Sequence, residues 1–108
     1  MIACQNDDMA LGVHRAFEDL PDPSARDAWL RLPITGCDGV PKAGQAWVRQ
    51  GWLTATIISP PLMGPAMELL ATALKTGSQP PERTLIAPDS FPAIKDLHKA
   101  EAGSVGKS

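Results

Sequence analysis

The stretch from Leu53 to Ser59, LTATIIS, decides the fold of this chain, because its β-branched residues make it the clearest strand in the sequence. Two prolines follow it directly and end it. Two shorter apolar runs precede it, at residues 1–4 and 32–37, and a further strand is predicted at residues 83–87. Helical patterns lie between these runs. Alternating strands and helices predict an α/β fold with a partial parallel sheet, flanking helices and right-handed crossovers.

Three helices are predicted from apolar spacing. The first has Asp7 as its expected cap, apolar positions from Met9 to Leu20, and Pro21 as its stop. The second starts at Pro41 and ends before Gly51, a residue type that suits a left-handed terminator. The third covers residues 62–76 and is closed by a glycine. Its apolar stripe consists of Met63, Ala66, Met67, Leu70 and Leu74.

Two aromatic rings outside the strands have predicted places. Residues 21–31 are rich in turn formers, and we interpret them as an insertion with a short helical turn, in which Trp29 covers the edge of the core. His14 lies off the apolar face of the first helix and is expected to be solvated.

Cys4 and Cys37 are expected to be free thiols, because neighbouring parallel strands rarely offer disulfide geometry.

Composition excludes some classes of protein. The 108 residues are 44% hydrophobic and 20% charged, which is typical of a globular chain. The net charge of −2 argues against a nucleic-acid partner, since such surfaces are basic. The first residues do not combine a basic segment with an apolar one, so no secretory signal is expected within this chain.

A polar residue follows each of the first three predicted strands: Asn6, Asp38 and Ser59. The carboxyl ends of parallel strands meet at one crevice, where such folds bind ligands. An Asn amide offers a donor and an acceptor in one plane, and an Asp carboxylate accepts from two hydroxyls. These groups therefore suit a polyhydroxylated ligand.

Three sequence motifs of the chain resemble those of a known family. QNDDMALG from Gln5, GCDG from Gly36 and GWLTATIISPP from Gly51 resemble, in this order, the C-terminal part of periplasmic sugar-binding proteins of the ribose-binding type. The resemblance runs from Met1 to about Asp89. It implies a fragment of a two-lobe periplasmic-binding-protein fold, with a ligand clamped between the lobes.

The resemblance also implies roles for individual residues. The Asn of QND and the Asp of the GFDG motif contact sugar hydroxyls in that family, which assigns ligand binding to Asn6 and Asp38. Ser59 stands where the family usually has a Gln, and Cys37 where it usually has an aromatic residue. Both are kept as candidate ligand-binding positions. No catalytic residue, metal or cofactor is expected.

The family layout divides the chain into four parts. Residues 1–58 correspond to the C-terminal lobe, and 59–82 to a hinge crossing and a helix that packs on the N-terminal lobe. Residues 83–90 correspond to a returning strand, and 91–108 to a weakly helical tail that frays from 102 onward.

This layout implies a function for the full-length parent. The parent is a periplasmic protein that captures a monosaccharide-type ligand for an ABC importer and meets a membrane permease. This chain alone lacks most of the clamp, so it is not expected to bind competently. Its uncovered methionine stripe favours self-association.

Two other interpretations stay open. The effector-binding domain of a lac-repressor-family regulator has the same fold, but such domains usually carry Ser-Asp in place of Gln5-Asn6-Asp7 and GFDD in place of residues 36–39. An enzyme is the other class. The residues that could supply acid–base or metal chemistry are Asp7, Asp8, Asp38, His14 and His98. They show no metal-ligand spacing and the chain has no nucleophile motif, so no enzyme is expected.

Overall fold

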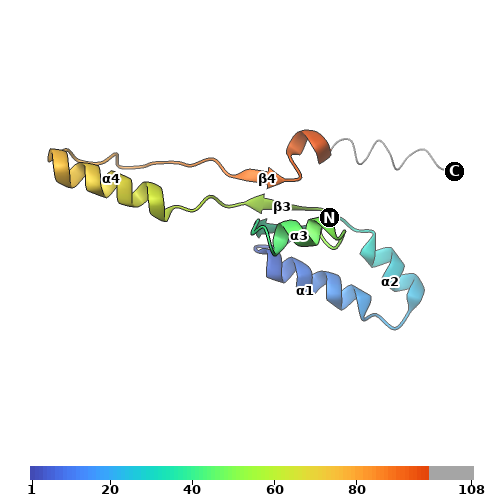
Figure 1. Cartoon of the computed structure of the whole chain (residues 1–108). Coiled ribbons are helices and arrows are strands. Elements are labelled where there is room, and N and C mark those ends of the chain that lie inside the picture. Colours follow the sequence, from blue (N-terminus) through green and yellow to red (C-terminus); the bar gives the residue numbers. More distant parts are fainter. Residues whose placement is uncertain (98–108) are drawn as a thin grey trace.

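Four strands form one sheet in the order β1-β2-β3-β4, within a computed structural model that describes residues 1–97 (Figure 1). The strands are β1 (Ile2–Ala3), β2 (Ile34–Asp38), β3 (Ala55–Ile58) and β4 (Asp89–Phe91). β1 pairs in parallel with β2, and β2 with β3, with Ile2 opposite Ile34 and Thr35 opposite Ala55. The α/β class and the parallel arrangement of the first three strands are therefore confirmed.

The last strand departs from the prediction. β4 runs antiparallel to β3, with Thr56 opposite Phe91, so the sheet is mixed. The strand also lies later than expected, because residues 83–88 form no strand. The reason is the path of the chain between β3 and β4. It leaves β3, continues through a long helix, and returns to the sheet in the opposite direction (Figure 1).

Three helices lie beside the sheet: α1 (Asp7–Glu18), α2 (Pro23–Leu30) and α3 (Gly44–Arg49). The N-cap of α1 is Asn6, whose Oδ1 accepts a hydrogen bond from the Met9 N–H at 2.8 Å. The assignment of the cap to Asp7 was therefore wrong by one residue. α3 begins three residues after Pro41, because residues 41–43 form a turn.

The core lies between α1, α3 and the sheet. Its buried centre consists of Ala10, Ile34 and Leu53, with Cys4, Val13, Phe17, Trp47 and Val48 packed around it. The buried face of α1 differs from the predicted stripe, since Met9 is 53% exposed. The buried positions are Asp7, Ala10, Leu11 and His14. The buried face of α1 differs from the apolar stripe because Asp7 and His14, which are polar and therefore not counted in apolar spacing, contact Thr56 and Trp52.

Two aromatic contacts hold the edges of this core. His14 is buried and stacks on Trp52 at 6.0 Å between ring centroids, and its Nε2 lies 3.3 Å from Oε1 of Glu18. The prediction of a solvated His14 was therefore wrong. Trp29 on α2 is 47% exposed and stacks at 5.3 Å on Phe17, which packs against the core, so Trp29 lies at the edge of the core as expected.

α4 (Met63–Thr76) projects away from the sheet, and residues 77–88 return beside it to β4 (Figure 1). Gly77 ends the helix in the left-handed region at φ 68°, as its residue type predicted. This arm makes the molecule long: it measures 65 × 30 × 22 Å, and its radius of gyration is 19.2 Å. A compact domain of this size has a radius of gyration of about 13 Å. In the described part of the chain, α4 contains no buried residue.

The described helices include none that is long and apolar enough to cross a membrane. Residues 94–97 begin a helical turn after β4, in line with the weak helical pattern there. The rest of that pattern, the fraying tail at 102–108, and His98 lie outside the described residues.

Candidate functional site

Asp7 connects the start of α1 to β3 and to the turn after β2. It lies in the first turn of α1 and is 3% exposed. One carboxylate oxygen accepts a hydrogen bond from the Thr56 hydroxyl in β3 at 2.6 Å, and the other accepts from the Gly39 N–H after β2 at 2.9 Å. A buried carboxylate is tolerated because both of its oxygens are paired. The start of α1 is thereby fixed to β3 and to the turn that follows β2.

Two glycines make room for this carboxylate. A Cβ atom at Gly36 in β2 or at Gly44 in α3 would collide with the Asp7 carboxylate. The sequence did not predict this network, because Gly39 and Thr56 lie 32 and 49 residues after Asp7 and no local spacing connects them to it. The local signals that were present are the acidic residue after Asn6 and the glycines around Asp38.

Asp38 ends β2 in an uncommon backbone conformation. Its φ is 112°, in the left-handed half of conformational space that non-glycine residues rarely adopt. Its side chain is exposed, while Gly39 behind it is buried. The turn is close to β3, since a Cβ at Gly39 would lie 2.6 Å from the Ile58 Cα. Strained residues held by such tight surroundings concentrate at binding sites and active sites.

Cys37, Asp38 and Ser59 lie together at the ends of β2 and β3. The Ser59 N–H donates to the Asp38 carbonyl at 3.2 Å, and the Cys37 Sγ lies 3.5 Å from the Ser59 Oγ. Both cysteines are free thiols, as predicted. The structure thus brings together three of the four predicted site residues in direct contact.

Asn6 reaches the same edge through its neighbour. It directly precedes Asp7, which holds the Gly39 N–H next to Asp38. Its side-chain oxygen caps α1, so its amide NH₂ is the group that can donate to a ligand. The edge therefore combines a donor on Asn6, an acceptor on Asp38 and a hydroxyl on Ser59.

A separate hollow lies between the sheet and residues 94–97. It holds about 270 Å³ and is lined mainly by apolar groups, among them Ala55, Ile57, Ile94 and Leu97. It includes none of Asn6, Cys37, Asp38 and Ser59. It is thus distinct from the strand-end site.

The strand-end site contains no metal-binding cluster: among residues 1–97, His, Cys, Asp and Glu side chains form no group of three or more that could hold an ion.

Comparisons of the chain with protein-family models, with curated proteins and with solved structures found no match.

Proposed function

We propose that this chain is the C-terminal part of a solute-binding protein that captures a sugar for ABC-type import. In this proposal, Asn6 and Asp38 bind sugar hydroxyls, and Ser59 and Cys37 lie at the rim of the same site. The full-length parent works in the periplasm and delivers its ligand to a membrane permease.

One observation carries the proposal: the Asp7 network fixes the turn after β2 while it leaves Asp38 exposed. The carboxylate of Asp7 accepts hydrogen bonds from the Gly39 N–H, next to Asp38, at 2.9 Å and from the Thr56 hydroxyl within β3 at 2.6 Å. Asp38, directly before Gly39, adopts φ 112° and has an exposed side chain. An exposed carboxylate acceptor and an amide donor at the same edge of the sheet suit the hydroxyls of a sugar.

The open form of the site supports a two-lobe parent. The four site residues are exposed or half-buried, whereas sites for small molecules bury most of their ligand. A second lobe that closes on this edge would supply the missing contacts. The exposed apolar stripe of α4 is likewise suited to a covering surface on that lobe.

The test is a titration of tryptophan fluorescence with a panel of monosaccharides, on the full-length parent and on this chain. We expect the parent to respond at micromolar sugar and this chain to respond weakly or not at all. Asn6→Ala and Asp38→Ala in the parent should each weaken binding at least about tenfold, because each removes hydrogen bonds made in a buried site. Asp8→Ala is the matched control, since Asp8 is exposed in the first turn of α1.

Failure of the parent to respond to any sugar would contradict the sugar-binding assignment. Binding of the parent to an operator DNA through an upstream helix-turn-helix would instead assign the chain to the effector domain of a lac-repressor-family regulator. The same site residues would then contact the effector of that regulator.

A further inference from the structure

α4 carries an exposed apolar stripe with the spacing of a helix-pairing seam. Met63, Met67, Leu70 and Leu74 are spaced by four, three and four residues, and their exposed fractions lie between 51% and 77%. Such spacing places large side chains at the a and d positions of a heptad pattern. The stripe therefore has the form of a surface that packs against another helix.

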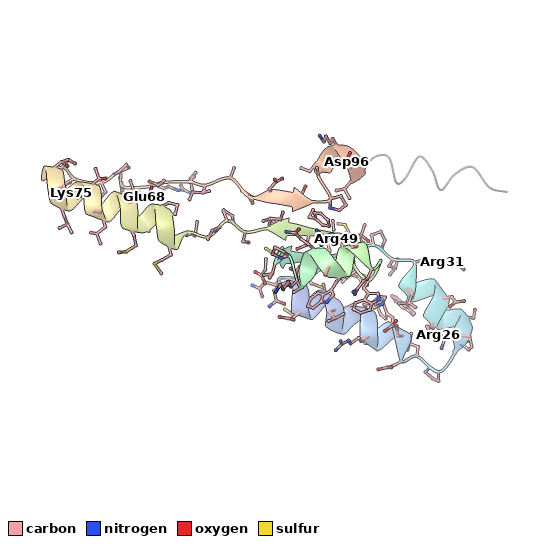
Figure 2. The ribbon with its side chains drawn as sticks, in the orientation of Figure 1. Arg26, Arg31, Arg49, Glu68, Lys75 and Asp96 are labelled. Atoms are coloured by element: carbon pink, nitrogen blue, oxygen red, sulfur yellow. The ribbon has the colours of Figure 1, made fainter. Side chains whose placement is uncertain are left out.

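The positions that flank this stripe are all small. Gly64 and Ala71 lie on one side of it, and Ala66 and Ala73 on the other. Small flanking residues allow two helices to approach closely. The two charged residues of α4, Glu68 and Lys75, are labelled in Figure 2. They are seven residues apart, which is close to two helical turns, so they lie on the same side of the helix and outside the stripe. No charge on the stripe or beside it repels a second copy.

The pattern of large and small residues along α4 is the same in both directions of the helix. The large positions 63, 67, 70 and 74 are symmetric about the midpoint between Glu68 and Leu69, and so are the small positions 64, 66, 71 and 73. An interface across a two-fold axis uses the same patch on both copies, so it requires a self-complementary surface. An antiparallel pair centred on this midpoint places Met63 opposite Leu74, and Met67 opposite Leu70, of the second copy.

α4 also lacks support from its own chain. None of its residues is buried by the other described residues and only Leu69 and Ala73 are half-buried, while a helix of 14 residues is marginal in water without tertiary packing. Half of its lateral surface amounts to roughly 300 Å² for a cylinder about 10 Å wide and about 21 Å long. Stable interfaces bury about 800 Å² per partner, so a pair of such helices associates weakly.

We infer that two copies of this chain pair through α4 as antiparallel helices across a two-fold axis, in a weak and concentration-dependent dimer. This pairing needs no sugar site and is independent of the proposed function. It occupies the stripe that a second lobe would cover in a full-length parent.

Sedimentation equilibrium of the full chain over a concentration series measures the dimer. We expect a monomer–dimer equilibrium with a dissociation constant on the order of 10–100 μM, as for other small interfaces. Leu70→Gln places a polar amide in the seam and should raise the dissociation constant at least about tenfold. Thr72→Gln is the matched control, because position 72 lies on the side of α4 opposite the stripe and should leave the constant unchanged.

Disulfide trapping tests the orientation. In a background with Cys4→Ala and Cys37→Ser, copies with Met67→Cys are mixed with copies with Leu70→Cys in a glutathione buffer. The antiparallel pair predicts a mixed disulfide between the two variants, whereas a parallel pair gives disulfides within each variant. Circular dichroism confirms that every variant keeps the helix content of the parent chain at the same concentration.

Three results would overturn the inference. The first is a monomer over the whole concentration range, and the second is a dimer that Leu70→Gln does not weaken. The third is a dimer that Leu70→Gln abolishes but that forms no mixed disulfide: disulfides within each variant would then show a parallel pair, and no disulfide at all would show that α4 does not pair with α4 of the second copy.

Discussion

Removing the Asp7 carboxylate should destabilise the whole sheet, because this group connects α1, β2 and β3. Asp7→Ala leaves the buried Thr56 hydroxyl and the Gly39 N–H without the acceptor they have at 2.6 and 2.9 Å. An unsatisfied buried donor costs about 1–3 kcal/mol, so the pair costs about 2–6 kcal/mol. Domains of this size have a stability of only about 5–10 kcal/mol, so the loss is a large share of the total.

Two conservative variants separate the parts of this network. Thr56→Val keeps the volume and removes one donor from a buried carboxylate, at a cost of about 2 kcal/mol. Asp7→Asn keeps the shape: its carbonyl can accept from the Gly39 N–H while its NH₂ donates to the Thr56 hydroxyl, so about 1 kcal/mol is lost with the charge. We therefore expect the order Asp7→Ala, then Thr56→Val, then Asp7→Asn, from most to least destabilised.

Urea unfolding followed by tryptophan fluorescence measures these differences, since Trp47 and Trp52 are half-buried in or beside the core. When the same variants are unfolded by heat, each kcal/mol of lost stability should lower the melting temperature by about 4–8 °C in a domain of this size. Asp8→Ala is the control and should change the stability by less than about 1 kcal/mol, because Asp8 is exposed. If Asp7→Ala unfolds at the same urea concentration as Asp8→Ala, the carboxylate does not hold the strand ends together.

Three further predictions concern single elements of the fold. Asn6→Ala should cost about 1 kcal/mol in urea unfolding, because α1 loses its cap, and Asn6→Asp should restore most of it. Gly51→Ala should destabilise by about 1 kcal/mol, since its φ is +80°, whereas Gly12→Ala within α1 should stabilise by about 0.5–1 kcal/mol; equal signs for the two in thermal unfolding would refute this reasoning. Trp29→Ala should lose the stack on Phe17 and leave α2 open to limited proteolysis, and an unchanged cleavage rate would show that the contact does not hold α2 in place.

The sequence predicted the elements whose signals are local. The β-branched run before Ser59 became β3, the prolines around residue 21 ended α1, and Gly51 and Gly77 adopted the left-handed conformation their residue type favours. The convergence of Cys37, Asp38 and Ser59 followed from the parallel order of their strands. These features depend on a few neighbouring residues or on simple topology.

Long-range partners explain what the sequence could not predict. Asp7 and His14 are polar residues in buried positions, and their burial depends on Thr56 and on Trp52, far along the chain. β4 lies after a return segment whose length no local signal fixes, so its position was predicted several residues too early. The return of the chain after α4 brings β4 to the edge of β3 in the antiparallel direction, which the sequence did not indicate.

A structure of the full-length parent with its sugar bound tests the central claim most directly. The account predicts that the Asn6 amide donates to one sugar hydroxyl and that the Asp38 carboxylate accepts from others, at hydrogen-bond distances of about 2.7–3.2 Å. It also predicts that Asp7 keeps its bonds to Thr56 and Gly39 in the complex. A ligand that contacts neither Asn6 nor Asp38 would contradict the assignment of this strand-end site.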